Sequence, residues 1–227
     1  MNWFKFKDVF SYEFDNLIVN ELPNIIKPAQ RVEKIEVDGR NGNLNIFSNT
    51  YESMTLNIQC TIKNLEGIDI LFNWLRGSGE VVFSNQPDLY YKASIINQIP
   101  LERVITTFRT FVIELEVQPF GYLIEENNIN IDSNINITNI GNVYSEPKIY
   151  VYGVGSGDIT INDTNIHIKN ISPGMVIDSE LLQCHLNNKN LGREMVGEYP
   201  VLLEGNNNIN ISGGISSITV VPRWRRC

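Results

Sequence analysis

The stretch LEGIDILFNWLRGSGEVVFSNQPDLYY at residues 65–91 decides the fold, because it predicts one short helix joined directly to one β-hairpin. Apolar residues in its first part recur at the spacing of an amphipathic helix, namely Ile68, Leu71, Phe72 and Leu75. Asn64 is placed to cap the start of this helix, and Gly77 is placed to end it. A helix this short is marginal alone, so packing of its apolar stripe against the rest of the chain must stabilise it.

The hairpin after the helix is predicted from two apolar segments, residues 80–83 and 89–91, with Pro87 and Asp88 at the centre of a type I turn. Helix and hairpin carry apolar side chains beyond the stripe, which we predict to form a subunit interface: Ile70, Trp74, Val81, Phe83, Tyr90 and Tyr91. Exposed apolar patches are rarely left uncovered, and aromatic residues are enriched at interface hot spots. For Phe83, burial in the protomer's own core is an equally good interpretation.

Around this stretch the chain alternates apolar and polar residues with a period of two. Residues 54–62 and 111–117 both predict half-buried antiparallel strands. Residues 35–37 and 44–47 predict shorter strands, joined by a turn at residues 38–42. The first part of the chain is therefore expected to be a β-sandwich with one inserted α-helix and a β-hairpin.

The composition changes after Gly121, where the chain becomes rich in Asn and Ile. The phrases at residues 127–131 and 207–211 are identical, and they predict opening and closing strands of one further sandwich. Between them lie many short apolar segments separated by Gly, Asn and Pro, a pattern typical of a β-sandwich or jelly roll. We predict a mainly β chain with two domains, residues 1–124 and 125–227.

Charge and length narrow the classes of function. The chain has 227 residues and a net charge of −8, which argues against general binding of nucleic acid or of an anionic membrane surface. Its N-terminus lacks the pattern of a signal peptide, and no segment has the length of a membrane span, so no membrane insertion is expected. The basic cluster at residues 223–226 is interpreted as a solvated or partner-facing end of the chain.

No residue pattern predicts catalysis. The two histidines, His167 and His185, lack the partners of a zinc site, and no nucleophile elbow or phosphate-binding loop is present. We expect no enzyme activity, no metal and no cofactor. Exposed aromatic residues of the second domain are a candidate surface for a partner or a glycan: Tyr150, Tyr152 and Trp224.

Several phrases, in order along the chain, resemble the distal tail protein (Dit) family of long-tailed phages of Gram-positive bacteria. The turn Gly39-Arg40-Asn41-Gly42 is similar to the family's Gly-Arg-Asp-Gly turn, with Asn41 in place of the usual Asp. Matching phrases lie at residues 16–19, 74–79, 87–91, 177–180, 199–202, 205–207 and 222–224. The resemblance spans almost the whole length of the chain.

The resemblance implies a structural protein of the virion, located at the tail tip after assembly in the host cytoplasm. Members of the family form a hexameric ring that joins the tail tube to the receptor-binding and baseplate proteins and lets the DNA genome pass. Their second domain is a galectin-like or carbohydrate-module-like sandwich. We further predict that acidic residues of the first domain line the lumen of the ring, where they would repel phosphates.

Two other functions remain open at this point. The chain could be a carbohydrate-binding module or adhesin that recognises host cell-wall glycans through residues 125–227. Alternatively, pairs of carboxylates such as Glu114 and Glu116 could support glycoside hydrolysis if a cleft held them at the right separation.

Overall fold

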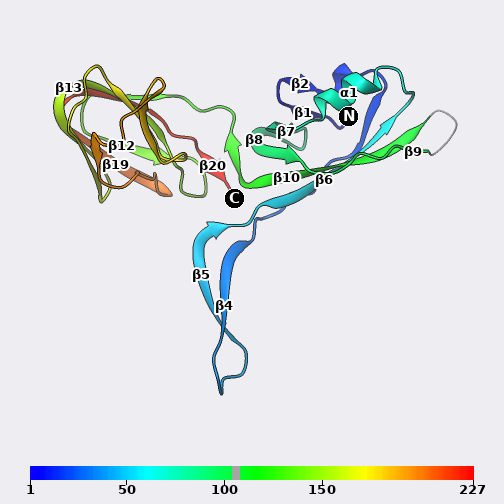
Figure 1. Ribbon diagram of the computed structural model, residues 1–227, viewed down its shortest axis with the longest axis horizontal. Helices are drawn as coiled ribbons and strands as arrows, with labels where there is room; N and C mark the ends of the chain where they lie inside the picture. Colours follow the sequence, from blue (N-terminus) through cyan, green and yellow to red (C-terminus); the bar gives the residue numbers. More distant parts are fainter. Residues whose placement is uncertain (104–107) are drawn as a thin grey trace. The chain divides into compact units, whose positions relative to one another are not determined.

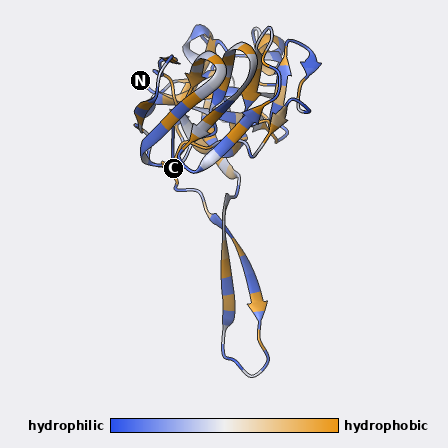
Figure 2. Cartoon of the chain, turned by 90° about the vertical axis from the view of Figure 1, so that its left-hand side faces the viewer, coloured by the Kyte–Doolittle hydropathy of each residue, from blue (hydrophilic) through white to orange (hydrophobic). Residues whose placement is uncertain are grey.

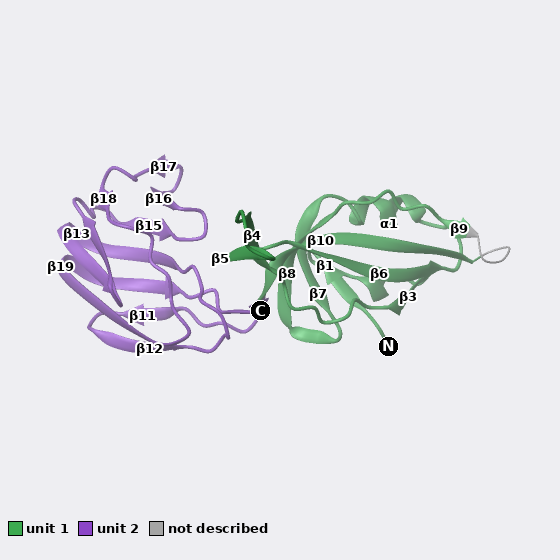
Figure 3. Cartoon of the chain, turned by 90° about the horizontal axis from the view of Figure 1, so that it is seen from below, with its two compact units in different colours: residues 1–121, 227 green, residues 122–226 purple. Residues whose placement is uncertain are grey.

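The computed structural model describes residues 1–103 and 108–227. The chain forms two compact units, Met1–Gly121 with Cys227, and Tyr122–Arg226 (Figure 3). Both units are built from strands, and the predicted mainly β class is confirmed. The predicted boundary after residue 124 lies a few residues beyond the point where the first unit ends.

The first unit is built on one antiparallel sheet (Figure 1). Its strand order is β2 (Val9–Phe10), β1 (Phe4–Phe6), β7 (Ser78–Phe83), β8 (Gln86–Ile95), β10 (Arg109–Leu123), β6 (Met54–Ile62) and β3 (Leu17–Glu21). The short strand β9 (Glu102–Arg103) also pairs with β10, and a 3-10 turn, η1 (Ser11–Glu13), follows β2. Strand β20 (Arg225–Arg226) pairs with β10 as well, but its residues belong to the second unit.

Strands β6 and β10 form the centre of this sheet and confirm the predicted alternation. Their register places Ile58 opposite Ile113 and Leu56 opposite Leu115, so apolar side chains of both strands share one face. All four of these residues are buried. Cys60 lies in the same row, and burial raises the pKa of its thiol to about 12, as expected for an unreactive structural cysteine.

The predicted helix is present as α1 (Ile68–Trp74), but its details differ from the prediction. Gly67, with a left-handed backbone (φ 67°), is the N-cap, and Asn64 instead accepts a hydrogen bond from the Glu66 N–H at 3.0 Å. The buried face is formed by Leu71, Trp74 and Leu75, whereas Phe72 is 36% exposed. The inward face is therefore rotated relative to the predicted stripe, because the large ring of Trp74 occupies the core.

The predicted hairpin is also present, and its turn lies elsewhere. Phe83 of β7 pairs with Gln86 of β8, so the two residues Ser84 and Asn85 form the turn. Pro87 and Asp88 belong to β8. The predicted turn at Pro87 and Asp88 was therefore wrong.

A second hairpin leaves the sheet of the first unit and is called the arm below. It consists of β4 (Gln30–Glu36) and β5 (Asn43–Tyr51), which form a separate two-stranded sheet (Figures 1 and 2). At its base the Glu52 N–H donates to the Ala29 carbonyl at 2.8 Å, and the Tyr51 ring packs edge-on against Phe120 at 5.2 Å.

The second unit contains another antiparallel sheet. Its strand order is β11 (Ile129–Ile131), β19 (Gly205–Val221), β13 (Lys148–Ile161), β15 (Met175–Asp178), β16 (Gln183–Leu186) and β17 (Lys189–Asn190). Three further strands pair with its members: β12 (Ile135–Asn139), β14 (Thr164–Ile168) and β18 (Met195–Val196). Strands β11 and β12 both pair with β19, which brings the two Asn/Ile-rich parts of the chain together.

The long strands β13 and β19 are interrupted by a bulge between Gly153 and Gly157. Here the two backbones approach so closely that a Cβ on Gly214 would lie 1.9 Å from the Val154 carbonyl oxygen. Only glycine fits such an approach. This glycine-rich segment is thus an irregular part of a strand pair.

Candidate functional site

The arm exposes apolar side chains that the chain itself does not cover. Ile35 lies directly opposite Leu44 in the register, and Ile46 lies two residues further along β5, so these three share one face. Ile46 is 46% exposed, and Phe47 on the opposite face is 62% exposed. Figure 2 shows the alternation of apolar and polar residues along both strands of the arm.

An arm of this kind is a candidate contact element for physical reasons. An isolated two-stranded hairpin is marginally stable in water and is normally supported by a third strand or by packing against another element. Among the described strands, β4 and β5 pair only with each other, so each has a free edge. Free edges and an apolar face together form a template for another chain.

The surface of helix α1 provides a second exposed apolar group. Ile70 is 67% exposed, and Leu65, which precedes the helix, is 51% exposed. Ile70 borders an open pocket of about 360 Å³, whose wall also includes Phe14 and Lys63. Of the predicted interface residues, Ile70 is the one that the structure places fully on the surface.

Most of the other predicted interface residues are core residues, and their predicted exposure is corrected. Trp74 is stacked between the rings of Phe4 (5.2 Å) and Phe14 (4.8 Å), and its Nε1–H donates to the Phe6 carbonyl at 3.0 Å. The two rings bury its apolar surface, and the hydrogen bond pairs its indole N–H. Trp74 is therefore part of the protomer's own core.

The hairpin residues Val81, Phe83 and Tyr91 are buried for a topological reason. Strand β7 lies between β1 and β8, and β8, which carries Tyr91, lies between β7 and β10, so both are central strands with a covered inward face. The Tyr91 hydroxyl donates to Gln86 Oε1 at 2.9 Å. Tyr90 points to the other face of the sheet and is half-buried. The sequence shows that these residues are apolar but not which element covers them.

The outer face of the same sheet is polar and carries an excess of acidic groups. Its alternating positions on β7, β8 and β10 include the carboxylates of Glu80, Asp88, Glu114 and Glu116. Lys92 lies opposite Glu80 in the register and is the basic residue of these strands' shared face. This face is the feature that the predicted acidic lumen would require.

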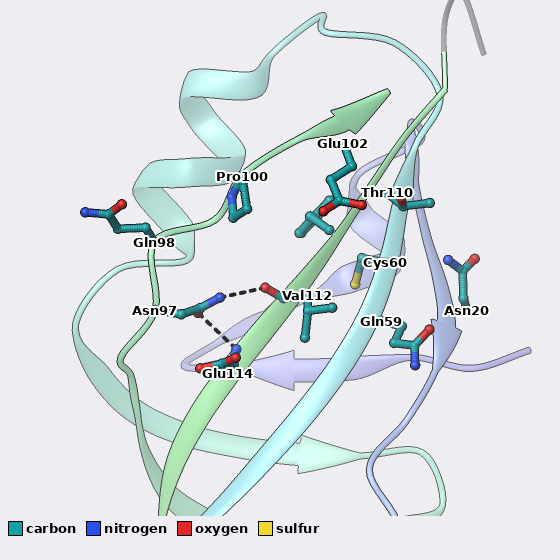
Figure 4. Close-up of a pocket in the computed structure, with 11 residues that line it drawn as sticks. Asn20, Gln59, Cys60, Asn97, Gln98, Pro100, Glu102, Thr110, Val112 and Glu114 are labelled. Carbon is teal, nitrogen blue, oxygen red and sulfur yellow. Dashed lines mark hydrogen bonds between the residues drawn. The ribbon is translucent and has the colours of Figure 1, made fainter. Parts of the chain in front are cut away.

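A pocket of about 460 Å³ lies at one end of this polar face (Figure 4). Its wall is rich in side-chain amides, including Asn20, Gln59 and Asn97. Asn97 donates to the Val112 carbonyl at 2.8 Å and accepts from the Glu114 N–H at 3.0 Å. The Asn97 amide thus occupies the hydrogen-bonding positions that a neighbouring strand would fill along β10.

The C-terminal basic cluster is folded into the second unit, which corrects its interpretation as a solvated end. Arg223 binds Asp178 through two hydrogen bonds of 2.7 and 2.9 Å, and it also pairs with Glu180 at 3.3 Å. Arg225 pairs with Glu146 at 2.9 Å. These arginines therefore act inside the protein and are not a patch for nucleic acid.

Asp178 is the most deeply buried carboxylate of this cluster, with 1% of its side chain exposed. Burial alone raises the pKa of Asp178, but the hydrogen bonds and the charge of Arg223 outweigh it and hold the pKa below its usual value. Lys148 contributes a further positive charge at 4.0 Å. The carboxylate is thus kept ionised by its partners.

Fewer aromatic residues are exposed on the predicted partner or glycan surface of the second unit than the sequence suggested. Trp224 is buried, and its backbone N–H donates to Glu126 at 3.0 Å, so its predicted exposure is corrected. Tyr150 is half-buried, with Lys148 Nζ 5.6 Å from its ring centre, and Tyr152 is 46% exposed. Tyr152 is the member of this set that remains available on the surface.

Several asparagines of the second unit form side-chain hydrogen bonds between neighbouring segments of its sheet. Asn208 donates to Asn136 at 2.9 Å, and Thr138 donates to Asn206 at 2.8 Å, which links β12 to β19. Asn162 donates to Asn207 at 2.8 Å. These asparagine side chains therefore satisfy one another's hydrogen-bonding groups across neighbouring segments.

Neither a metal-binding cluster nor a membrane-spanning helix is present in the parts of the chain that the structure describes. Residues 1–103 and 108–227 hold no group of three or more His, Cys, Asp or Glu side chains that could bind a metal ion. In the same residues, no helix has the length and apolar character needed to cross a membrane.

Comparison with known proteins defines the class of this chain as a phage tail protein. Residues 2–117 match the sequence model of the family described as phage tail protein RIFT-related domain, and the chain belongs to this family. A search of curated protein sequences found no match. The resemblance to phage tail proteins noted from the sequence is confirmed, and the protein is a component of the phage tail.

A solved structure gives the particular fold. The chain is similar to the Dit protein (gp 19.1) of phage SPP1, described as a paradigm of the hub adsorption apparatus in phages that infect Gram-positive bacteria. The similarity covers 97% of this chain and 98% of that chain, with a TM-score of 0.75 and 11% sequence identity. Both units thus have the fold of a distal tail protein.

Proposed function

We propose that this phage tail protein is a non-enzymatic hub that assembles into a hexameric ring at the tail tip. In this proposal the ring joins the tail tube to the baseplate and receptor-binding proteins and lets the DNA genome pass. Assembly takes place in the host cytoplasm. The observation that carries the proposal is the arm, whose apolar face and free strand edges are left uncovered by its own chain.

A second copy of the chain is the partner that the arm favours. The exposed side chains of the arm are aliphatic and aromatic, and removing them from water contributes about 25 cal/mol per Å² of apolar surface, from which the cost of association is subtracted. Helix α1 exposes a further apolar group around Ile70 and Leu65 on every copy. In a closed ring each protomer gives its arm to one neighbour and receives an arm from the other.

The polar face of the first sheet supports the second part of the proposal. Carboxylates such as Glu80, Glu114 and Glu116 outnumber basic groups on this face. We propose that this face lines the lumen, where like charge repels the phosphates of DNA and keeps the genome from binding to the wall. A cryo-EM structure of the assembled ring tests this assignment, and a neutral or basic lumen would contradict it.

Measurement of mass in solution tests the ring itself. We expect the wild-type chain to form a six-subunit species with rising concentration, as measured by native mass spectrometry and light scattering. The variant Leu44→Asp places a charge on the apolar face of the arm and should abolish this species. Its matched control, Asn45→Asp, places the same charge on the neighbouring residue, which faces the other side of β5.

The outcomes separate the proposal from its alternatives. A wild-type chain that stays monomeric at the highest concentration, both alone and with the tail tube protein, would contradict ring assembly. Equal loss of the oligomer in Leu44→Asp and Asn45→Asp would show that the apolar face of the arm is not the contact.

The alternative of a glycan-binding module is weakened but can be tested separately. Of its three aromatic candidates, Trp224 is buried and Tyr150 is half-buried, which leaves Tyr152. Titration of the full chain with cell-wall glycans, compared with Tyr152→Ala, decides this alternative. Saturable binding that the substitution removes would support it.

A further inference from the structure

The tip of the arm carries a chemical feature that ring assembly does not use. Asn41 and Gly42 form the one Asn-Gly pair of the sequence. Both residues are exposed and lie between β4 and β5, outside the paired strands. We propose that Asn41 is a site of spontaneous deamidation, through which the tip of the arm gains a carboxylate as the protein ages.

The reaction needs no cofactor and balances with water alone. The Gly42 backbone nitrogen, after loss of its proton, attacks the Asn41 side-chain carbonyl carbon. A C–N bond forms, ammonia leaves, and the chain passes through a five-membered cyclic imide. Water then opens either of the two imide C–N bonds and gives aspartate or isoaspartate. The net change is one water consumed and one ammonia released.

The local structure leaves the attacking nitrogen accessible. Gly42 has no side chain, its backbone is left-handed (φ 77°), and an added Cβ would meet no atom within 4 Å. Among the residues that the structure describes, neither the Gly42 N–H nor the Asn41 side-chain amide is engaged in a hydrogen bond. A loop tip without such restraints can sample the conformations that bring the two atoms together.

The arm supplies its own comparison in Asn45. This residue is also exposed, but it lies within β5, opposite Lys34, and is followed by the β-branched Ile46. Strand pairing holds its backbone extended, and the Ile46 side chain hinders attack by the nitrogen. We therefore expect Asn41 to react at a rate roughly tenfold or more above that of Asn45, which corresponds to about 1.36 kcal/mol in activation free energy.

Peptide mapping by mass spectrometry tests the proposal on the full chain. Samples are incubated at neutral and at mildly alkaline pH, and the mass increase that replaces NH2 by OH is followed at each asparagine. We expect the first conversion at Asn41, a faster rate at alkaline pH, and a mixture of aspartate and isoaspartate. The variant Asn41→Gln should remove the earliest acidic species, because a glutamine would have to form a larger ring.

The same peptide-mapping measurements can contradict the proposal in two ways. Conversion of Asn45 or of other asparagines before Asn41 would contradict it. So would strong protection of Asn41 in the folded chain relative to the chain in denaturant, because the tip would then be held in a form that blocks attack. Because the measurement requires only the monomeric chain, its result does not depend on whether the ring assembles.

Discussion

Strand β6 and the arm have the same alternating sequence pattern but differ in the burial of their apolar side chains. In β6, the apolar positions Leu56, Ile58 and Cys60 are buried against the rest of the first unit. In the arm, Ile35 and Leu44 occupy equivalent alternating positions and stay exposed. A period of two therefore identifies which face of a strand is apolar. Burial depends on whether another element, or another chain, covers that face.

The largest effect is expected in the core that the helix completes. Trp74→Ala removes the ring that lies between Phe4 and Phe14, together with its hydrogen bond to the Phe6 carbonyl. We expect the free energy of unfolding of the first unit to fall by about 3–5 kcal/mol. Hydrogen exchange followed by mass spectrometry measures this loss for each unit separately.

The matched control for Trp74 is its neighbour on the helix surface. Ile70→Ala, at a side chain that is 67% exposed, should change the stability of the monomer by no more than about 0.5 kcal/mol. A comparable loss in both variants would contradict the assignment of Trp74 to the core and Ile70 to the surface.

A smaller but clear effect is expected at the buried ion cluster of the second unit. Asp178→Asn removes the charged acceptor of two hydrogen bonds from Arg223 and should destabilise this unit by about 1.5–3 kcal/mol. Asp158→Asn is the control, because Asp158 pairs with His167 near the surface and is 40% exposed. Its loss should be about 0–1 kcal/mol.

The same cluster predicts a dependence of stability on pH. The pKa of Asp178 is lower in the folded state than its ordinary value of 3.8, so the unfolded state binds the proton first. Its contribution to stability is therefore present above pH 3.8 and is lost as the pH falls through the folded-state pKa. Acid titration of hydrogen exchange in residues 122–226 measures this, and Asp178→Asn should remove that part of the loss.

The contrast between core and arm also shows how far the sequence can predict this molecule. Alternation located β6 and β10, and the helical spacing located α1, because these signals depend on local geometry alone. The exposure of Trp74 was predicted incorrectly, because the rings of Phe4 and Phe14 that cover it come from distant parts of the chain. Trp224 was likewise predicted to be exposed and is buried.

The position of the arm was predicted, but the exposure of its apolar side chains was not. Residues 35–47 gave the strands and the turn, and their sequence resembles that of a half-buried hairpin. No local sequence signal indicates that the chain itself supplies no element to cover this hairpin. The free edges became visible only when the strand order showed that β4 and β5 form a sheet of their own.

The smallest effect tests the opening contrast between β6 and the arm directly. Leu44→Ala removes an arm side chain that is 39% exposed, and we expect the unfolding free energy of the monomer to change by no more than about 0.5 kcal/mol. Leu56→Ala makes the same substitution in β6, where the side chain is 5% exposed, and should cost about 2–5 kcal/mol. Both values are read by hydrogen exchange at concentrations where the chain is monomeric. A large loss in Leu44→Ala under those conditions would mean that the arm packs against its own chain, and the argument for a second copy as its partner would fail.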